Sequence, residues 1–144
     1  MIRQANKFDK DHVLELLREA YADINFQTKI NIENYEYQGR VFDAVVAGRG
    51  VIFLEENKGL LGAIIAPTFF DNKTFVMNCM AWIVRPKYRN TRLAYALMKE
   101  YIAYGEKLKQ EGRIAYYTIG KTPHTPDMDY TKLGFRKTDE TWAR

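Results

Sequence analysis

The chain has 144 residues, of which 47% are hydrophobic and 28% charged, and its formal net charge is +4. This length predicts one domain over residues 1–144 with a core of its own, and the composition excludes a disordered chain. No apolar run approaches the roughly 20 residues of a membrane span, and the N-terminus lacks the apolar centre of a signal peptide. We therefore expect a cytoplasmic protein without a membrane partner.

The first half of the chain predicts two helices and the strands around them. A short strand over residues 2–5 precedes a helix over residues 9–21, for which Asp9 is a suitable N-cap. A second helix is expected over residues 33–47, ended by Gly48. Three strands separated by turns follow, over residues 51–54, 60–66 and 74–84.

The second half contains the longest helical pattern, over residues 91–110, where apolar side chains recur at helical spacing. A strand over residues 113–119, a short helix over residues 127–133 and a final strand over residues 134–142 complete the chain. The order β-α-α-β-β-β-α-β-α-β predicts an α/β fold, with a mixed central sheet flanked by helices.

A basic turn joins the strand over residues 74–84 to the long helix. Its cationic side chains are Arg85, Lys87, Arg89 and Arg92. Because the first N–H groups of a helix have no partner within it, this turn predicts a site for an anion such as a phosphate or pyrophosphate. Charges crowded into one turn suit a compact polyanion better than a duplex groove, so the sequence disfavours a nucleic-acid partner.

Three motifs carry a resemblance to a known family. The strand ends in Val84-Arg85-Pro86, and an aromatic-Arg pair, Tyr88-Arg89, follows it. The loop Arg89-Asn90-Thr91-Arg92-Leu93-Ala94 opens the helix, and Tyr130-Thr131-Lys132-Leu133-Gly134-Phe135 lies further on. In this order the motifs resemble the GNAT superfamily of acetyl-CoA-dependent N-acetyltransferases, and the loop is similar to those of short members encoded by tailed phages.

The resemblance implies a mostly antiparallel sheet in which the strands over residues 74–84 and 113–119 separate to admit the pantetheine arm of acetyl-CoA. It assigns cofactor binding to Trp82, Ile83, Val84, Arg89, Asn90, Thr91, Arg92, Leu93 and Ala94. Backbone N–H groups near Trp82 and Ile83 would hold the thioester carbonyl oxygen, and Tyr130 would be the general acid. Arg92 stands where the family usually has glycine; it would either narrow the loop or hold a phosphate with its guanidinium.

The general base is not assigned by the sequence. The strand over residues 74–84 has no carboxylate, and Ala81 stands where related sequences often have one. Asn78 can orient a water, His124 has a suitable ordinary pKa, and the amine can also lose its proton to bulk water. We expect Cys79 to be a buried core residue and not a nucleophile. No metal site is expected.

The acceptor pocket is expected between the first two helices, the turn Thr68-Phe69-Phe70 and the loop around His124, with Phe26, Tyr35 and Tyr37 as lining candidates. Glu33 and Glu36 offer charge to a cationic amine or form a solvated helix end. We predict an N-acetyltransferase that uses acetyl-CoA and an unidentified primary amine by direct attack on the thioester. The alternatives are a non-catalytic acyl-CoA-binding module and a protein or nucleic-acid interaction module; a homodimer through the final strands is compatible with the sequence.

Overall fold

The computed structural model describes residues 1–23, 30–121, 125–142 and 144. A five-stranded sheet lies at the centre, in the spatial order β1-β2-β3-β4-β5. The strands are β1 (Arg3–Gln4), β2 (Gly50–Glu55), β3 (Gly59–Pro67), β4 (Phe75–Val84) and β5 (Tyr116–Thr118). Neighbouring strands are antiparallel as far as β4, and β5 runs parallel to β4. The expected α/β fold with a mostly antiparallel sheet is confirmed.

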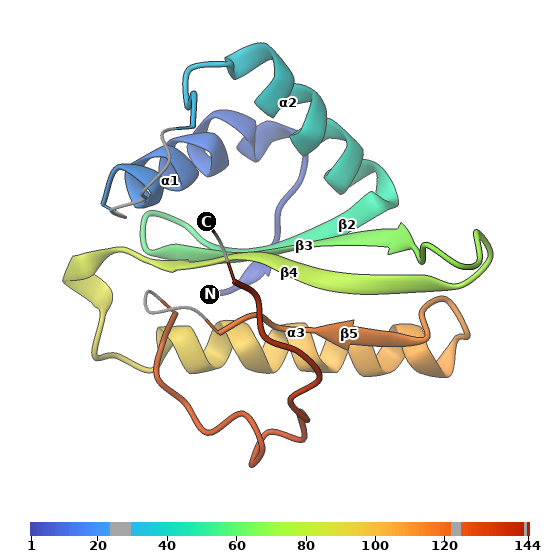
Figure 1. Ribbon diagram of the computed structural model, residues 1–144. Helices are drawn as coiled ribbons and strands as arrows, with labels where there is room; N and C mark the ends of the chain where they lie inside the picture. The colour runs from blue at the N-terminus through green and yellow to red at the C-terminus, as the bar shows by residue number, and fades with distance from the viewer. Residues whose placement is uncertain (24–29, 122–124, 143) are drawn as a thin grey trace.

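Helices cover both faces of this sheet (Figure 1). α1 (Lys10–Asp23) and α2 (Tyr35–Ala44) lie on one face, and α3 (Leu93–Gln110) lies on the other. Each face has its own buried cluster, because side chains of a strand alternate between the faces. On the α3 face the fully buried side chains include Leu97, Met98, Tyr101 and Leu108.

The N-terminal cap differs from the expectation. Asn6, and not Asp9, caps a single 3-10 turn (Lys7–Asp9) that leads into α1, by accepting a hydrogen bond from the Phe8 N–H at 2.9 Å. Asp9 closes this capping box by accepting from the Asn6 N–H at 2.8 Å. It also accepts hydrogen bonds from the two terminal nitrogens of the Arg3 guanidinium, and these bonds lower the pKa of the Asp9 carboxyl. Asp9 thus ties β1 to α1.

The last two expected elements also differ. The helix expected over residues 127–133 is one hydrogen-bonded turn, in which the N–H of Phe135 donates to the Tyr130 carbonyl at 3.0 Å. Asp129 caps the start of this turn, and Gly134 ends it with a φ of 94°. Because Asp129 and Gly134 are only a few residues apart, the segment between them is too short for a stable helix. The described residues after Phe135 form no strand; their sequence is mostly charged and has no alternating apolar residues to bury.

Other boundaries shift by a few residues. α2 ends at Ala44, and a π-helical turn (Val45–Arg49) containing Gly48 at a φ of 118° leads into β2. β5 is shorter than expected, because the turn after α3, in which Gly112 has a φ of 72°, extends to Arg113, whose N–H still donates to the Leu108 carbonyl oxygen at 2.9 Å. The Ala115 N–H already donates to the Phe75 carbonyl oxygen of β4 at 2.8 Å.

Candidate functional site

The site region begins at a bulge in β4. Gly62 of β3 lies opposite Ala81, whereas Ala63 lies opposite Cys79, so Met80 has no partner on β3. One extra residue bends a strand and shifts its side-chain alternation by one. Met80 itself is 65% exposed.

The shift in alternation is visible in the packing of β4. Before the bulge Met77 contacts the cluster on the α3 face, and after the bulge Trp82 and Val84 do so. Ala81 and Ile83 pack against the cluster on the opposite face. Apolar residues at both odd and even positions of this one strand therefore reach the α3 face.

Beyond the bulge, β4 and β5 are not paired. The parallel ladder consists of Val76, Met77 and Asn78 opposite Tyr116, Tyr117 and Thr118. Within the part of the chain that the structure describes, residues 79–84 have no strand on this side. The expected separation of the two strands is thus present, and it leaves backbone N–H and C=O groups of β4 available to an extended ligand.

Hydrogen bonds made by side chains hold β4 and β5 together at the last residues that they pair. The hydroxyl of Tyr101, from α3, donates to the Thr118 carbonyl oxygen at 2.7 Å and lies 3.3 Å from the Met77 carbonyl oxygen. The Thr118 hydroxyl donates to the Asn78 side-chain oxygen at 2.7 Å. Burial raises the pKa of the Tyr101 hydroxyl well above its usual value, so it remains a donor. These three side chains fix the point at which the strands part.

The turn after β4 holds only part of the expected cation cluster. Arg85 forms two hydrogen bonds with the Glu19 carboxylate on α1, at 2.9 and 3.0 Å, and a third with the Asn57 carbonyl oxygen. This pairing raises the pKa of the Arg85 guanidinium. The inclusion of Arg85 among the anion-binding side chains is therefore corrected, since its guanidinium fastens the turn to α1.

The rest of the loop presents backbone donors at the start of α3. Asn90 has a φ of 65°, the left-handed conformation that asparagine adopts more readily than most residues other than glycine. The Thr91 hydroxyl accepts from the Leu93 N–H at 3.3 Å and donates to the Tyr88 carbonyl oxygen at 2.6 Å. The first backbone bond of the helix is from the Ala96 N–H to the Arg92 carbonyl oxygen.

Several backbone donors of this loop are consequently unused. In the described portion of the chain, no acceptor is found for the N–H groups of Asn90, Thr91, Arg92, Ala94 and Tyr95. Unpaired N–H groups converging at a helix N-terminus form a site for an anion. The Arg92 side chain is exposed and has no ion pair with any described residue.

Two further bonds fix the loop to β4. The Arg89 side chain donates from Nε to the Val84 carbonyl oxygen at 3.0 Å. The Trp82 indole donates from Nε1 to the Ala94 carbonyl oxygen at 3.2 Å. Trp82 and Arg89 therefore join the open half of β4 to the start of α3.

Tyr130 lies beside the same part of β4. Its ring centroid is 6.4 Å from that of Trp82, and the Lys121 ammonium lies 5.5 Å above the ring. The Tyr130 hydroxyl donates to the Pro126 carbonyl oxygen at 2.9 Å. To protonate a leaving group, this hydroxyl would have to exchange the Pro126 carbonyl for the leaving atom.

The candidate bases and nucleophile are placed as follows. Asn78 lies at the end of the β4–β5 ladder, with its side-chain oxygen engaged by Thr118. Burial raises the pKa of the Cys79 thiol to about 12, so it is not a thiolate at neutral pH, in agreement with its reading as core. His124 and Phe26 lie outside the described residues.

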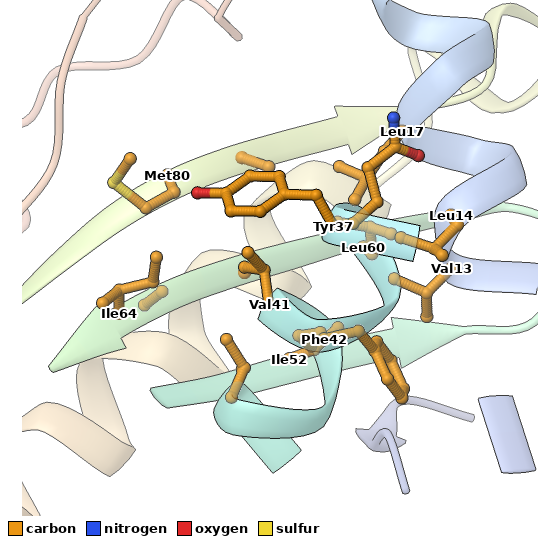
Figure 2. Close-up of a pocket in the computed structure, with 15 residues that line it drawn as sticks. Val13, Leu14, Leu17, Tyr37, Val41, Phe42, Ile52, Leu60, Ile64 and Met80 are labelled. Atoms are coloured by element: carbon orange, nitrogen blue, oxygen red, sulfur yellow. The ribbon is translucent and has the colours of Figure 1, made fainter. Parts of the chain in front are cut away.

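An apolar cavity of about 270 Å³ lies on the opposite face of the sheet, between α1, α2 and the middle of the sheet (Figure 2). Of the residues expected around the acceptor, Tyr37 lines it. Tyr35 instead stacks under the Arg18 guanidinium at 4.1 Å. Phe69 and Phe70, at 94% and 93% exposure, point into solvent at the β3–β4 turn and do not line it.

Sequence reasoning missed Met80, Tyr101 and Thr118 as parts of this region. The helical spacing correctly predicted that Tyr101 is a core residue of α3. Nothing in that spacing indicates that its hydroxyl reaches two strands. The bulge at Met80 gave no signal, because almost every residue of β4 is apolar and the change in alternation is hidden.

Comparison with known proteins identifies the class. The family model described as the acetyltransferase (GNAT) family matches residues 11–135. The chain therefore belongs to the GNAT acetyltransferase family. Among curated proteins no sequence match was found.

Solved structures share the fold. A predicted acetyltransferase from Clostridium acetobutylicum, crystallised with acetyl-CoA, has a TM-score of 0.75 at 18% identity, over 100% of this chain and 94% of that one. Trypanosoma brucei acetyltransferase has a TM-score of 0.66 at 19% identity, over 100% of this chain and 97% of that one. Glucosamine-6-phosphate N-acetyltransferase from Arabidopsis thaliana has a TM-score of 0.66 at 16% identity, over 100% of this chain and 96% of that one.

Among the described residues, none of the helices is both long enough and apolar enough to cross a bilayer. Over the same residues, no three His, Cys, Asp or Glu side chains lie together as a metal site would need.

Proposed function

We propose that this protein transfers an acetyl group from acetyl-CoA to a primary amine, by direct attack of the amine on the thioester. The observation that carries the proposal is the open half of β4, which ends at a loop in which several N–H groups have no acceptor among the described residues. An extended arm with a pyrophosphate at one end matches that combination of an unpaired strand edge and an anion site. Membership of the GNAT family and the acetyl-CoA in the Clostridium acetobutylicum structure support the choice of donor.

Each part of the donor has a candidate partner in the chain. The N–H groups of Asn90, Thr91, Arg92 and Ala94 would bind the pyrophosphate, and the Arg92 side chain would add a charge-assisted bond. Arg89 would help by holding the loop against Val84. The edge of β4 from Trp82 to Val84 would hydrogen-bond the pantetheine arm, and an N–H near Trp82 or Ile83 would hold the thioester oxygen as it becomes negative.

Tyr130 would supply the proton for the leaving group. The amine nitrogen forms a bond to the thioester carbon, the carbon–sulfur bond breaks, and the sulfur takes the phenolic proton of Tyr130. The proton lost by the amine passes to water, and Tyr130 recovers its proton from solvent. With no carboxylate on β4, deprotonation of the amine would occur through water or before binding. Asn78 would orient such a water with its side-chain NH2 group, because its side-chain oxygen accepts from the Thr118 hydroxyl.

Titration calorimetry with acetyl-CoA tests the donor, with dephospho-CoA and ADP as controls. We expect selective micromolar binding of acetyl-CoA, followed by release of the CoA thiol when an amine such as hexylamine is added. Binding of acetyl-CoA without turnover on any amine of a broad panel would instead favour the non-catalytic acyl-CoA-binding module. Equal binding of all three ligands would overturn the donor site.

A further inference from the structure

The cavity on the α1–α2 face has an unusual lining for a protein that must bind an amine. Among the described residues, those that line it are almost all aliphatic or aromatic, and none of them carries a carboxylate, ammonium or guanidinium group. A cationic group placed inside would lose its hydration without gaining a charged partner.

The two polar side chains of the lining do not change this character. Gln38 is already engaged, because its side-chain oxygen accepts from the Arg18 Nε at 3.2 Å and its amide donates to the Ile32 carbonyl oxygen at 2.9 Å. Of the lining residues that the structure describes, this leaves the Tyr37 hydroxyl as the remaining polar side-chain group. Glu36 does not contribute, because it lies outside the lining and pairs with Arg40 at 2.8 Å.

The cavity opens beside the bulge of β4. Two of its lining residues, Tyr37 and Met80, are 55% and 65% exposed, so the cavity reaches the surface between them. In Figure 2 the Tyr37 ring extends from α2 toward Met80. Met80 and Ala81 directly precede Trp82 and Ile83, beside which the thioester carbonyl is placed in the proposed function. One end of the cavity therefore adjoins the reacting bond.

We infer that the acceptor is a primary amine with an apolar body, aliphatic or aromatic, which fills this cavity while the amino group lies at the Met80 end. The inference rests on the proposed function and adds the substrate class. The volume sets the size: an apolar cavity of about 150 Å³ holds a benzene molecule, so 270 Å³ accommodates a phenylethyl group or a chain of similar bulk.

The apolar lining also offers a way to keep the amine neutral without a general base on β4. Desolvation disfavours the charged form of an amine and lowers its pKa, so the cavity mouth would hold the amine neutral, as nucleophilic attack requires. A carboxylate on β4 would have the opposite effect on an amine, by stabilising its charged form. The absence of a carboxylate from β4 and the apolar cavity next to it therefore serve the same reaction.

The decisive experiment compares hexylamine with cadaverine. The two amines have equal length, but the far end of hexylamine is a methyl group and the far end of cadaverine is a second ammonium. Release of the CoA thiol is measured with each. We expect kcat/KM for hexylamine to exceed that for cadaverine by at least about 50-fold, because the far ammonium would be buried without a partner. Equal rates, or a preference for cadaverine, would overturn the inference while leaving the proposed function intact.

Substitutions at Val41, which is half-buried on α2, test the cavity itself. Val41→Phe fills it and should lower kcat/KM for hexylamine at least about tenfold, with acetyl-CoA affinity unchanged within a factor of two. Val41→Ala enlarges it and should shift the preference toward bulkier amines. Val46→Phe is the matched control, since Val46 packs on the same cluster but does not line the cavity. An unchanged amine preference in both Val41 variants would count against this cavity.

A binding measurement separates the inference from the proposed function. The methyl resonance of Met80 is followed in the protein without acetyl-CoA as hexylamine or cadaverine is added. A shift with hexylamine and none with cadaverine is expected, whether or not the protein binds acetyl-CoA. No shift with hexylamine at millimolar concentration would overturn the cavity assignment. Failure to bind acetyl-CoA would overturn the proposed function alone.

Discussion

The two halves of β4 have different partners. The first half, up to Asn78, is paired on both sides, with β3 and with β5. The second half, after the bulge at Met80, is paired with β3 and, among residues 1–23, 30–121, 125–142 and 144, with no other strand. The same apolar sequence thus forms an interior strand at one end and an open edge at the other. The difference arises from one unpaired residue and from where Tyr101 holds β5, and it creates the candidate site.

The largest expected effect concerns the open half. Tyr130→Phe should lower turnover by roughly 100- to 10,000-fold, the usual contribution of a general acid, with acetyl-CoA affinity little changed. Steady-state kinetics with hexylamine and calorimetry with acetyl-CoA measure the two quantities. Tyr104→Phe is the control, because Tyr104 packs edge-on against Phe53 at 5.8 Å, away from Trp82. Turnover equal to that of the unmodified protein would remove Tyr130 from the mechanism.

The next effect concerns the loop where the open half ends. Arg92→Ala and Arg89→Ala should each weaken acetyl-CoA binding by about 1–3 kcal/mol, the range for charge-assisted hydrogen bonds. Arg92→Ala loses the bond to the pyrophosphate, and Arg89→Ala loses the bond to the Val84 carbonyl oxygen that holds the loop in place. Arg40→Ala removes the same charge from α2 and should leave the affinity unchanged. Titration calorimetry measures the acetyl-CoA affinity of each variant. Wild-type affinity in both loop variants would contradict the assignment of the anion site.

The paired half depends on close packing of β5 on α3. A methyl group at Gly105 would lie 2.6 Å from the Tyr117 ring, so Gly105→Ala should destabilise the protein by about 1–2 kcal/mol through overpacking. Gly39→Ala on α2 is the matched control, since its methyl would meet only the Lys10 side chain at 3.8 Å, and it should stabilise by up to ~1 kcal/mol. Urea unfolding measures both. A stabilised Gly105 variant would show that β5 is not held in this position.

The smallest effect concerns the junction between the halves. Tyr101→Phe removes the hydrogen bond to the Thr118 carbonyl and should cost about 1 kcal/mol of unfolding free energy. Because the junction sets the gap between the strands, the KM for acetyl-CoA should rise as well. Thr118→Val, which loses only the bond to Asn78, should change KM less. An unaltered KM in Tyr101→Phe would mean that the gap is held by other contacts.

Much of this architecture followed from local pattern. The spacing of Leu97, Tyr101 and Leu108 predicted which side of α3 is buried, and all three are fully buried. Gly134 predicted a sharp turn after Leu133, and it adopts a positive φ there. The loop before α3 was also recognisable, because its helix start and its basic side chains are local features. These properties depend on neighbours within a few residues, which the sequence displays directly.

Other features depend on contacts between distant segments. The pairing of Arg85 with Glu19 joins residues 66 positions apart, so the sequence alone placed Arg85 with the anion site. The helix expected over residues 127–133 did not form, since Asp129 and Gly134 enclose a single turn.

The sequence by itself therefore determined the order of the elements as far as β5, the buried stripe of α3 and the family to which the loop belongs, because each depends on short-range spacing. Only the tertiary structure decided where β4 changes its alternation and that an uncharged cavity adjoins the bulge. An apolar strand can pair in either register at similar local cost, so the choice is made by the segments packed against it: α3 on one face, α1 and α2 on the other.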